Sequence, residues 1–204
     1  MLDYDKVMNW PFEPVEQVLT PRDTMFYALS LGFGRDPLDE QELRFVYEEG
    51  LRPVPTIATV LARPTFWMRN PATGIDWVRI VHGEQAVRFH RPFPTEGAIV
   101  GQTRVKSVVD KGADRGALVF TENVLRLKDG GDVLCTLEST TVCRGDGGFG
   151  GPGSPVPSPH RVPERAPDDV CDLPTTRRQA LLYRLNGDRN PLHSDPQVAR
   201  RAGF

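Results

Sequence analysis

The stretch ALVFTENVLRLKDGGDVLCTLESTTVC, residues 117–143, decides the fold class of this chain. Val and Thr are frequent in its two halves, 117–127 and 133–143, and side chains of alternating kind follow one another along them. Both features are typical of extended strands. The sequence Asp-Gly-Gly-Asp at 129–132 is typical of a tight hairpin turn. The stretch therefore predicts two antiparallel strands joined by a short turn.

Further elements are expected on the N-terminal side of this hairpin. Extended chain of similar composition predicts three more strands, at residues 77–83, 85–89 and 100–109. Apolar segments predict three helices, one beginning at Thr20 and ending at Gly32, one at residues 39–49 and one at residues 56–62. We expect Gly50 to stop the second helix, and we take the third as the central helix. Helices followed by a long antiparallel meander predict an α+β domain whose curved sheet wraps one helix.

The first of these helices has a clear start signal. Thr20 suits the N-cap, and Pro21 suits the first helical position, where its missing N–H costs nothing. Three residues fall on one apolar face: Met25, Phe26 and Leu29.

Composition bounds the class of protein. With 204 residues, 39% of them hydrophobic and 25% charged, and a net charge of −2, the chain has the profile of an ordinary globular protein. No basic stripe indicates nucleic-acid binding, and no apolar run is long enough to span a membrane. The N-terminus has no signal-peptide pattern, so we expect a cytoplasmic protein, or a peroxisomal one in a eukaryote. Three scattered cysteines, Cys135, Cys143 and Cys171, indicate reduced thiols that act as small buried hydrophobes.

A Gly- and Pro-rich segment divides the chain. Residues 145–168 cannot continue a helix or a central strand, because Pro and Gly disfavour both. We expect a linker there, between an N-terminal domain at 1–144 and the beginning of a second domain at 169–204.

The run YRLNGDRNPLHSD, residues 183–195, carries the chemistry. It places the carboxylate of Asp188 and the imidazole of His193 five residues apart, across a turn built by Gly187 and Pro191. An acid/base pair of this kind can hold one water and deliver a proton beside it. The run thus indicates addition or removal of water.

Two other interpretations of this run stay open at the level of residues alone. Asn-Pro and Gly-Asp are ordinary turn signals, and a carboxylate beside a histidine is often only a satisfied polar pair. A metal site of Asp188, His193 and Asp195 would lack a cysteine or second histidine to fill the ligand set.

The whole run resembles the hydratase signature of the MaoC-like, R-specific enoyl-CoA hydratases: aromatic, aliphatic, small, Gly-Asp-x-Asn-Pro-aliphatic-His-x-acid. Asn186 stands where that pattern usually has Ser, Thr, Gly or Cys. The resemblance extends to the hydratase part of the peroxisomal multifunctional β-oxidation enzyme and its bacterial relatives. Segments that look alike lie along nearly the whole chain, at residues 22–32, 47–50, 80–85, 110–112, 148–151 and 179–204.

The resemblance implies a hot-dog fold used twice per chain, with a complete N-terminal hot-dog domain followed by the start of a second. It also implies reversible hydration of a trans-2-enoyl-CoA to the (R)-3-hydroxyacyl-CoA. Asp188 and His193 would activate the water, Asn190 would orient the loop or the water, and Tyr183 would pack beneath the loop. No metal or redox cofactor is expected, because the thioester polarises the double bond and CoA enters as part of the substrate.

Substrate contacts are assigned by the same resemblance. His82 and Gly83 would line the bound acyl-CoA, and the lysine that matches Lys111 contacts CoA, which suits a cation near phosphates. Four residues of the motif are added to this substrate-binding set: Tyr183, Arg189, Pro191 and Leu192. From their neighbours alone, His82 would be a sheet histidine and Lys111 a solvated turn lysine. We expect His90 and His160 to be surface residues.

A faint internal repeat points to duplication. Phe26-Tyr27-Ala28-Leu29 before Gly32 resembles Leu182-Tyr183-Arg184-Leu185 before Gly187. The first copy has no counterpart of His193, so we expect the N-terminal domain to have lost the acid/base pair and to serve substrate binding.

The resemblance also implies an oxyanion donor on a glycine of the second domain, in a region that only begins at residues 201–204. We therefore expect these 204 residues to hold the acid/base pair without that donor and without a second sheet. The chain would then form a homodimer or be completed by a second hot-dog domain. An alternative function is a non-catalytic or partner-completed acyl-thioester binding protein. We expect the 204 residues alone to be weakly active and to self-associate through Leu181, Leu182 and Leu185.

Overall fold

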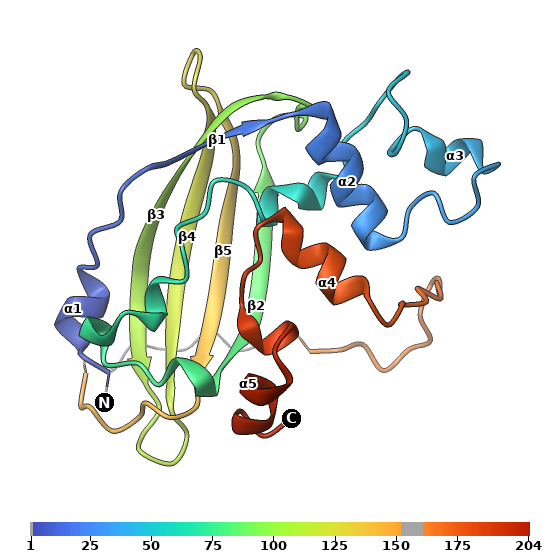
Figure 1. The fold of residues 1–204 in the computed structure, drawn as a ribbon. Coiled ribbons are helices and arrows are strands. Elements are labelled where there is room, and N and C mark those ends of the chain that lie inside the picture. Colours follow the sequence, from blue (N-terminus) through green and yellow to red (C-terminus); the bar gives the residue numbers. More distant parts are fainter. Residues whose placement is uncertain (1, 152–160) are drawn as a thin grey trace.

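The computed structural model describes residues 2–151 and 161–204, and it has the predicted α+β composition (Figure 1). Its centre is a five-stranded, wholly antiparallel sheet in the order β1-β3-β4-β5-β2. The strands are β1 (Val15–Leu19), β2 (Ile80–Phe89), β3 (Gly97–Asp110), β4 (Ala117–Leu127) and β5 (Val133–Cys143).

The predicted hairpin is confirmed, with β4 and β5 at the expected residues. The prediction of two strands at 77–83 and 85–89 is wrong in detail. Residues 77–79 form a turn of 3₁₀ helix, and the rest is one strand, β2, with a register shift between His82 and Glu84. Gly83 is the extra residue of this bulge, a common role for glycine in a strand. The short strand β1 was not predicted.

The helices are short and lie along one side of the sheet (Figure 1). The α-helices are α1 (Tyr4–Met8), α2 (Pro21–Leu31), α3 (Glu40–Leu43), α4 (Gln179–Tyr183) and α5 (Pro196–Arg201). The 3₁₀ turns are η1 (Pro55–Thr59), η2 (Trp67–Arg69), η3 (Pro71–Thr73), η4 (Trp77–Arg79), η5 (Arg184–Asn186) and η6 (Pro191–His193). None of the helices in the described part of the chain is long and apolar enough to cross a bilayer.

Helix α2 begins as predicted, at a capping box in which Thr20 and Asp23 bond to each other's backbone N–H groups. It ends at Gly32, whose φ of 102° is the left-handed conformation that favours glycine. Its buried face differs from the predicted one. Tyr27 is 2% exposed, whereas Leu29 is 50% exposed, because the helix packs on the core through Tyr27.

The helix predicted at 39–49 is present only as α3. Beyond it, the N–H groups of Phe45 and Val46 donate to carbonyls three residues back, which is a turn pattern. Aromatic and β-branched residues lower helix propensity there. The chain then turns at Gly50, with φ of 70°.

The central α-helix predicted at 56–62 is also wrong. The segment forms the 3₁₀ turn η1, because the β-branched Thr56, Ile57, Thr59 and Val60 resist an α-helix. Its central place is nevertheless confirmed, since its apolar side chains are buried against the sheet in one of the two core clusters: Ile57, Ala58, Val60, Leu61 and Ala62.

The C-terminal segment packs on this same core, because Tyr183 lies against it. The described residues between β5 and α4 contain no helix or strand, as the Gly/Pro composition predicts. Residues 152–160, and with them His160, lie outside the described residues. The division into domains at 145–168 therefore stays a prediction.

Two of the three cysteines have the predicted setting. Cys135 and Cys143 are buried and free, and burial raises the pKa of their thiols to about 11 and about 12, respectively. Cys171 is free but exposed, so the prediction that it is a buried hydrophobe is wrong.

Candidate active site

The predicted catalytic loop runs from the end of η5 to α5 at one edge of the molecule (Figure 1). Gly187 begins the loop with φ of 122°, and a Cβ there would lie 3.2 Å from the carbonyl oxygen of Val60. Any other residue at this position would strain the backbone, and its Cβ would crowd Val60, the residue that ends η1. The glycine lets the loop approach the core segment closely.

Hydrogen bonds within the loop give it a defined shape. The Asn190 N–H donates to Asp188 Oδ1 at 3.2 Å, and the Leu192 N–H donates to Asn190 Oδ1 at 3.0 Å. Asn190 is thereby the cap of turn η6, which Pro191 begins. Asn190 was expected to orient either the loop or the water, and these bonds fit the first of the two roles. Arg189 is exposed and bonds to none of these groups in the described residues.

Asp188 and His193 lie on the same loop, with Asp188 half-buried and His193 exposed. No hydrogen bond joins their side chains in the described part of the chain. His193 is the last residue of η6, and Asp188 lies before the Asn190 cap of that turn. Their joint role with one water therefore stays a prediction.

Two contacts dock the segment before the loop on helix α2. The Asn186 amide donates to Ser30 Oγ at 2.9 Å and to the Tyr183 carbonyl at 3.0 Å. The rings of Tyr27 and Tyr183 pack at 6.0 Å, and burial together with Tyr27 raises the pKa of Tyr183 to about 12. Asn186 thus ties this segment to α2, and Tyr183 packs on the core. That Tyr183 packs beneath the loop stays a prediction.

His82 lies on β2 near this loop. His82 is exposed, but protein atoms around one part of its ring desolvate it partly, and this lowers its pKa. The Arg63 guanidinium lowers the pKa further, while the Asp188 carboxylate opposes both. The three groups are therefore close enough to interact electrically. A Cβ at Gly83 would meet Val142 Cγ2 at 3.0 Å, so this bulge position suits glycine. Sequence analysis missed Arg63, because no motif marks it.

Lys111 lies at the same end of the sheet as His82, where β3 ends and β2 begins. The strand order places three strand spacings between them, roughly 14 Å at about 4.8 Å each. Lys111 is therefore not brought to the acid/base loop. An extended ligand such as a CoA thioester would be needed to touch both.

Asp110, beside Lys111, was also missed by the sequence analysis. Its carboxylate accepts the N–H groups of Gly112 at 2.8 Å, Gly148 at 2.7 Å and Gly150 at 2.7 Å. The bond from Gly148 is the largest cause that lowers the pKa of Asp110. One carboxylate thus fixes the glycine-rich loop after β5 against the turn that carries Lys111.

Other polar features carry no site. Among residues 2–151 and 161–204, no three His, Cys, Asp or Glu side chains gather closely enough to hold a metal ion, so Asp188, His193 and Asp195 form no such group. His90 is exposed, as predicted, and its Nε2 lies 3.0 Å from Thr136 Oγ1.

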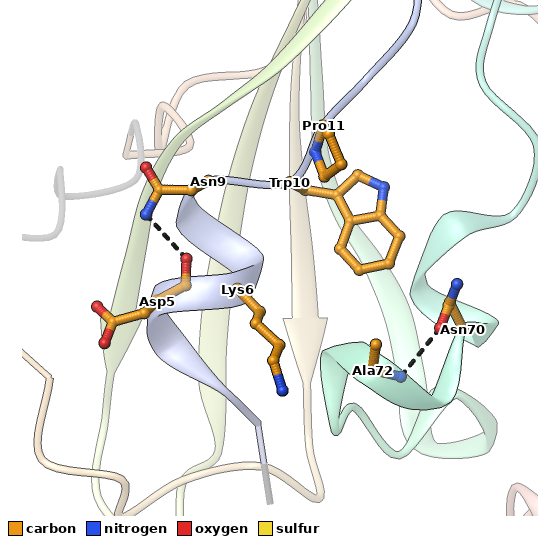
Figure 2. A pocket seen from close by; sticks show the side chains of 7 residues that line it. All are labelled: Asp5, Lys6, Asn9, Trp10, Pro11, Asn70 and Ala72. Carbon is orange, nitrogen blue, oxygen red and sulfur yellow. Dashed lines mark hydrogen bonds between the residues drawn. The ribbon is translucent and has the colours of Figure 1, made fainter.

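A surface hollow beside α1 contains none of the predicted site residues (Figure 2). Trp10 lines it, and two of the polar side chains around it are bonded to nearby backbone groups. Asn9 Nδ2 donates to the Asp5 carbonyl at 2.9 Å, and Asn70 Oδ1 accepts the Ala72 N–H at 2.9 Å (Figure 2). We assign no ligand to it.

Solved structures define the class of the fold. A MaoC-like dehydratase from Phytophthora capsici superposes with a TM-score of 0.76 at 31% identity, over 98% of this chain and 69% of its own. The full-length peroxisomal multifunctional enzyme type 2 from Drosophila melanogaster superposes with a TM-score of 0.73 at 31% identity, over 94% of this chain and 33% of its own. The chain is an α+β protein of the hot-dog class, as the resemblance implied.

The family follows from sequence matches. Residues 18–145 match the MFE-2 hydratase 2 N-terminal domain, and residues 159–204 match the MaoC-like domain. Enoyl-CoA hydratase ChsH3 of Mycobacterium tuberculosis is 38% identical over 100% of this chain and 71% of its own length. The peroxisomal enoyl-CoA hydratase 2 of Arabidopsis thaliana is 35% identical over 90% of this chain and 64% of its own length. The chain belongs to the MaoC-like hydratase family with an MFE-2 hydratase 2 N-terminal domain.

Proposed function

We propose that this protein reversibly hydrates trans-2-enoyl-CoA to (R)-3-hydroxyacyl-CoA. The observation that carries the proposal is the loop of Asp188, Asn190 and His193, docked through Tyr183 on the core and facing His82. A carboxylate and an imidazole on one shaped loop suit water activation. Relatives named enoyl-CoA hydratase support the same reaction.

The proposed reaction uses side chains alone. Asp188 and His193 bind one water, whose hydroxyl adds to C3 of the enoyl group while one of the two residues delivers a proton to C2. The O–H bond of water and the π bond between C2 and C3 break, and new C–O and C–H bonds form. The proton taken from the water replaces the proton that the acid/base pair delivers to C2. We propose no metal or redox cofactor, because the thioester carbonyl already withdraws electrons from the double bond.

Substrate contacts are proposed along the same end of the sheet. His82 and Gly83 would line the acyl thioester beside the loop, together with Tyr183, Pro191 and Leu192. Lys111, about three strands away, would meet the phosphate-bearing part of CoA, with Arg189 offering a second exposed cation at the loop.

Replacement of the acid/base pair tests the proposal. Asp188→Asn and His193→Gln should each lower crotonyl-CoA hydration by at least about a hundredfold, the usual scale for a general acid or base. Loss of enoyl absorbance and chiral analysis of the product give rate and stereochemistry. Asp195→Asn is the matched control, because Asp195 only caps α5 and should keep the rate. Near-normal turnover in both catalytic variants would remove the assignment.

A second candidate is an acyl-thioester binding protein completed by a partner sheet. Two observations favour it. Strand β2 is an edge of the sheet, and residues 82–86 on it are exposed. Leu181 and Leu185 are 52% and 63% exposed. An open strand edge and exposed apolar side chains each suit a homodimer or a second hot-dog domain.

We further propose a reducing compartment, the cytoplasm or, in a eukaryote, the peroxisome. The free thiols of the buried Cys135 and Cys143 suit such a compartment.

A further inference from the structure

Helix α2 and the segment before the catalytic loop meet through two pairs of side chains. Tyr27 lies opposite Tyr183, with ring centroids 6.0 Å apart, and the Asn186 amide donates to Ser30 Oγ at 2.9 Å. Within each segment the two positions are three residues apart, and on helical turns such positions share one face. The two contacts therefore join one face of α2 to one face of the segment that precedes Gly187.

The bonds of Ser30 fix the direction of the second contact. Ser30 is 2% exposed, and its Oγ donates at 2.7 Å to the Tyr27 carbonyl, which can only accept. The single hydroxyl hydrogen is therefore used inside α2, and only lone pairs of Oγ face the C-terminal segment. A partner on that segment has to be a donor. The Asn186 amide nitrogen meets this requirement, whereas the amide oxygen would not.

Asn186 uses both hydrogens of its amide nitrogen. One goes to Ser30, and the other goes to the Tyr183 carbonyl at 3.0 Å, on its own segment. An amide nitrogen carries two hydrogens, so this group is saturated. One half-buried side chain thus links the end of α4 to a buried hydroxyl of α2.

The catalytic loop starts at the next residue, Gly187. Its φ is 122°, and its N–H donates to the Arg184 carbonyl at 3.1 Å. A glycine restricts the backbone little, so the direction of the loop depends on the contacts on either side of it. On the C-terminal side, Asp188 Oδ1 accepts the Asn190 N–H at 3.2 Å. On the N-terminal side the anchor is Asn186, two residues before Asp188.

We propose that Asn186 is a positioning residue of the proposed hydratase site: its bond to Ser30 fixes where the Asp188 carboxylate meets the reacting water. The proposal rests on the proposed function. A displacement of about 1 Å at a catalytic group can cost about a hundredfold in rate. Asn186 acts through Asp188 and forms no bond with the reacting atoms.

Steady-state kinetics with crotonyl-CoA test the role. Asn186→Leu keeps a neutral side chain of similar size and removes the donor, so kcat should fall about tenfold to a hundredfold while KM changes less than about threefold. Ser30→Ala removes the acceptor and should have a similar effect. The double variant should be no slower than the slower single variant, because both changes remove the same bond. Additive losses, or normal kcat in Asn186→Leu, would overturn the proposal.

Two further variants separate positioning from a general loss of stability. Asn186→Gln keeps the amide on a longer side chain and should recover part of the rate. Asn9→Leu is the matched control, because it removes an amide bond of the same length, 2.9 Å from Asn9 Nδ2 to the Asp5 carbonyl in α1, and it should keep kcat. Thermal melts show that each variant is folded at the assay temperature. A loss of kcat in Asn9→Leu equal to that in Asn186→Leu would mean that the rate follows stability alone, which contradicts the proposal.

A measurement on Asp188 itself separates this proposal from the proposed function. The carbon-13 NMR signal of the Asp188 carboxyl group should move in Asn186→Leu and in Ser30→Ala, and it should stay in place in Asn9→Leu. If neither change moves this signal, the bond does not place the carboxylate and the proposal fails. If the unchanged protein does not hydrate crotonyl-CoA, the proposed function fails, and the carboxyl signal alone decides whether Asn186 places Asp188.

Discussion

The carboxylate of Asp110 holds two loops together, the turn after β3 and the glycine-rich loop after β5. It takes N–H groups from Gly112 on its own turn and from Gly148 and Gly150 on the glycine-rich loop. Carboxylates that accept several backbone N–H groups are stabilised in the ionised form. The bonds therefore link protonation of Asp110 to the stability of this end of the sheet.

Asp110→Asn should destabilise the fold in a pH-dependent way. The pKa of Asp110 is lowered in the folded protein, so its contribution is present above the ordinary Asp pKa of about 3.9 and is lost as pH falls through the folded value. We expect Tm at pH 7 to fall by roughly 5 °C, with a smaller difference near pH 3. Asp114→Asn, at an exposed position of the same turn, is the control for thermal melts. An equal loss of Tm at both pH values would contradict the linkage.

The residues of the site differ in how far the sequence reveals them. Asp188, Asn190 and His193 lie within six positions of each other, so a local motif identifies them. Arg63 lies far from them in sequence, and its charge acts on that of Asp188 only because the fold brings the two segments near each other. A proximity made by tertiary packing leaves no local pattern.

At the scale of elements, the periodicity of the sequence correctly predicted where the hairpin strands lie and which apolar segment is buried. Strands β4 and β5 were found at their residues, because cross-strand pairing rewards the alternating, β-branched pattern. The apolar run at 56–62 correctly predicted a buried segment, but the segment is a 3₁₀ helix and not the predicted α-helix. An apolar run indicates burial, whereas the choice between α-helix, 3₁₀ helix and turn depends on local sterics and on packing against the sheet.

The strand order also places Lys111, the proposed CoA contact, far from His82 and the acid/base loop. Lys111→Ala should raise KM for crotonyl-CoA by about threefold to tenfold and leave kcat within about twofold, because a remote phosphate contact is made in ground state and transition state alike. The rough 14 Å between Lys111 and His82 is the reason. Lys128→Ala, at the other end of β4, is the control. A collapse of kcat with unchanged KM would contradict the binding role.

At the scale of the molecule, the two copies of the internal repeat pack on each other. Tyr27 and Tyr183 occupy matching positions in the repeat, and their rings are in contact. Each copy is a short helix followed by a glycine with positive φ, Gly32 or Gly187. The similarity of sequence thus has a structural counterpart. The order of the strands leaves β2 at an edge of the sheet.

The exposed leucines near that edge lead to the last prediction. Leu181 and Leu185 are more than half exposed, and Leu29 on the neighbouring α2 is 50% exposed. Exposed apolar side chains and an unpaired strand edge each favour association. We therefore expect the 204-residue chain to self-associate with rising concentration in sedimentation velocity.

Charges on this surface should reverse the association. The double variant Leu181→Glu, Leu185→Glu should sediment mainly as a monomer, because each carboxylate resists removal from water. Leu38→Glu is the matched control: Leu38 is 85% exposed, on the segment before α3, and its replacement should leave the association unchanged. A monodisperse unmodified monomer would contradict the prediction, and the exposed leucines would then be ordinary surface residues.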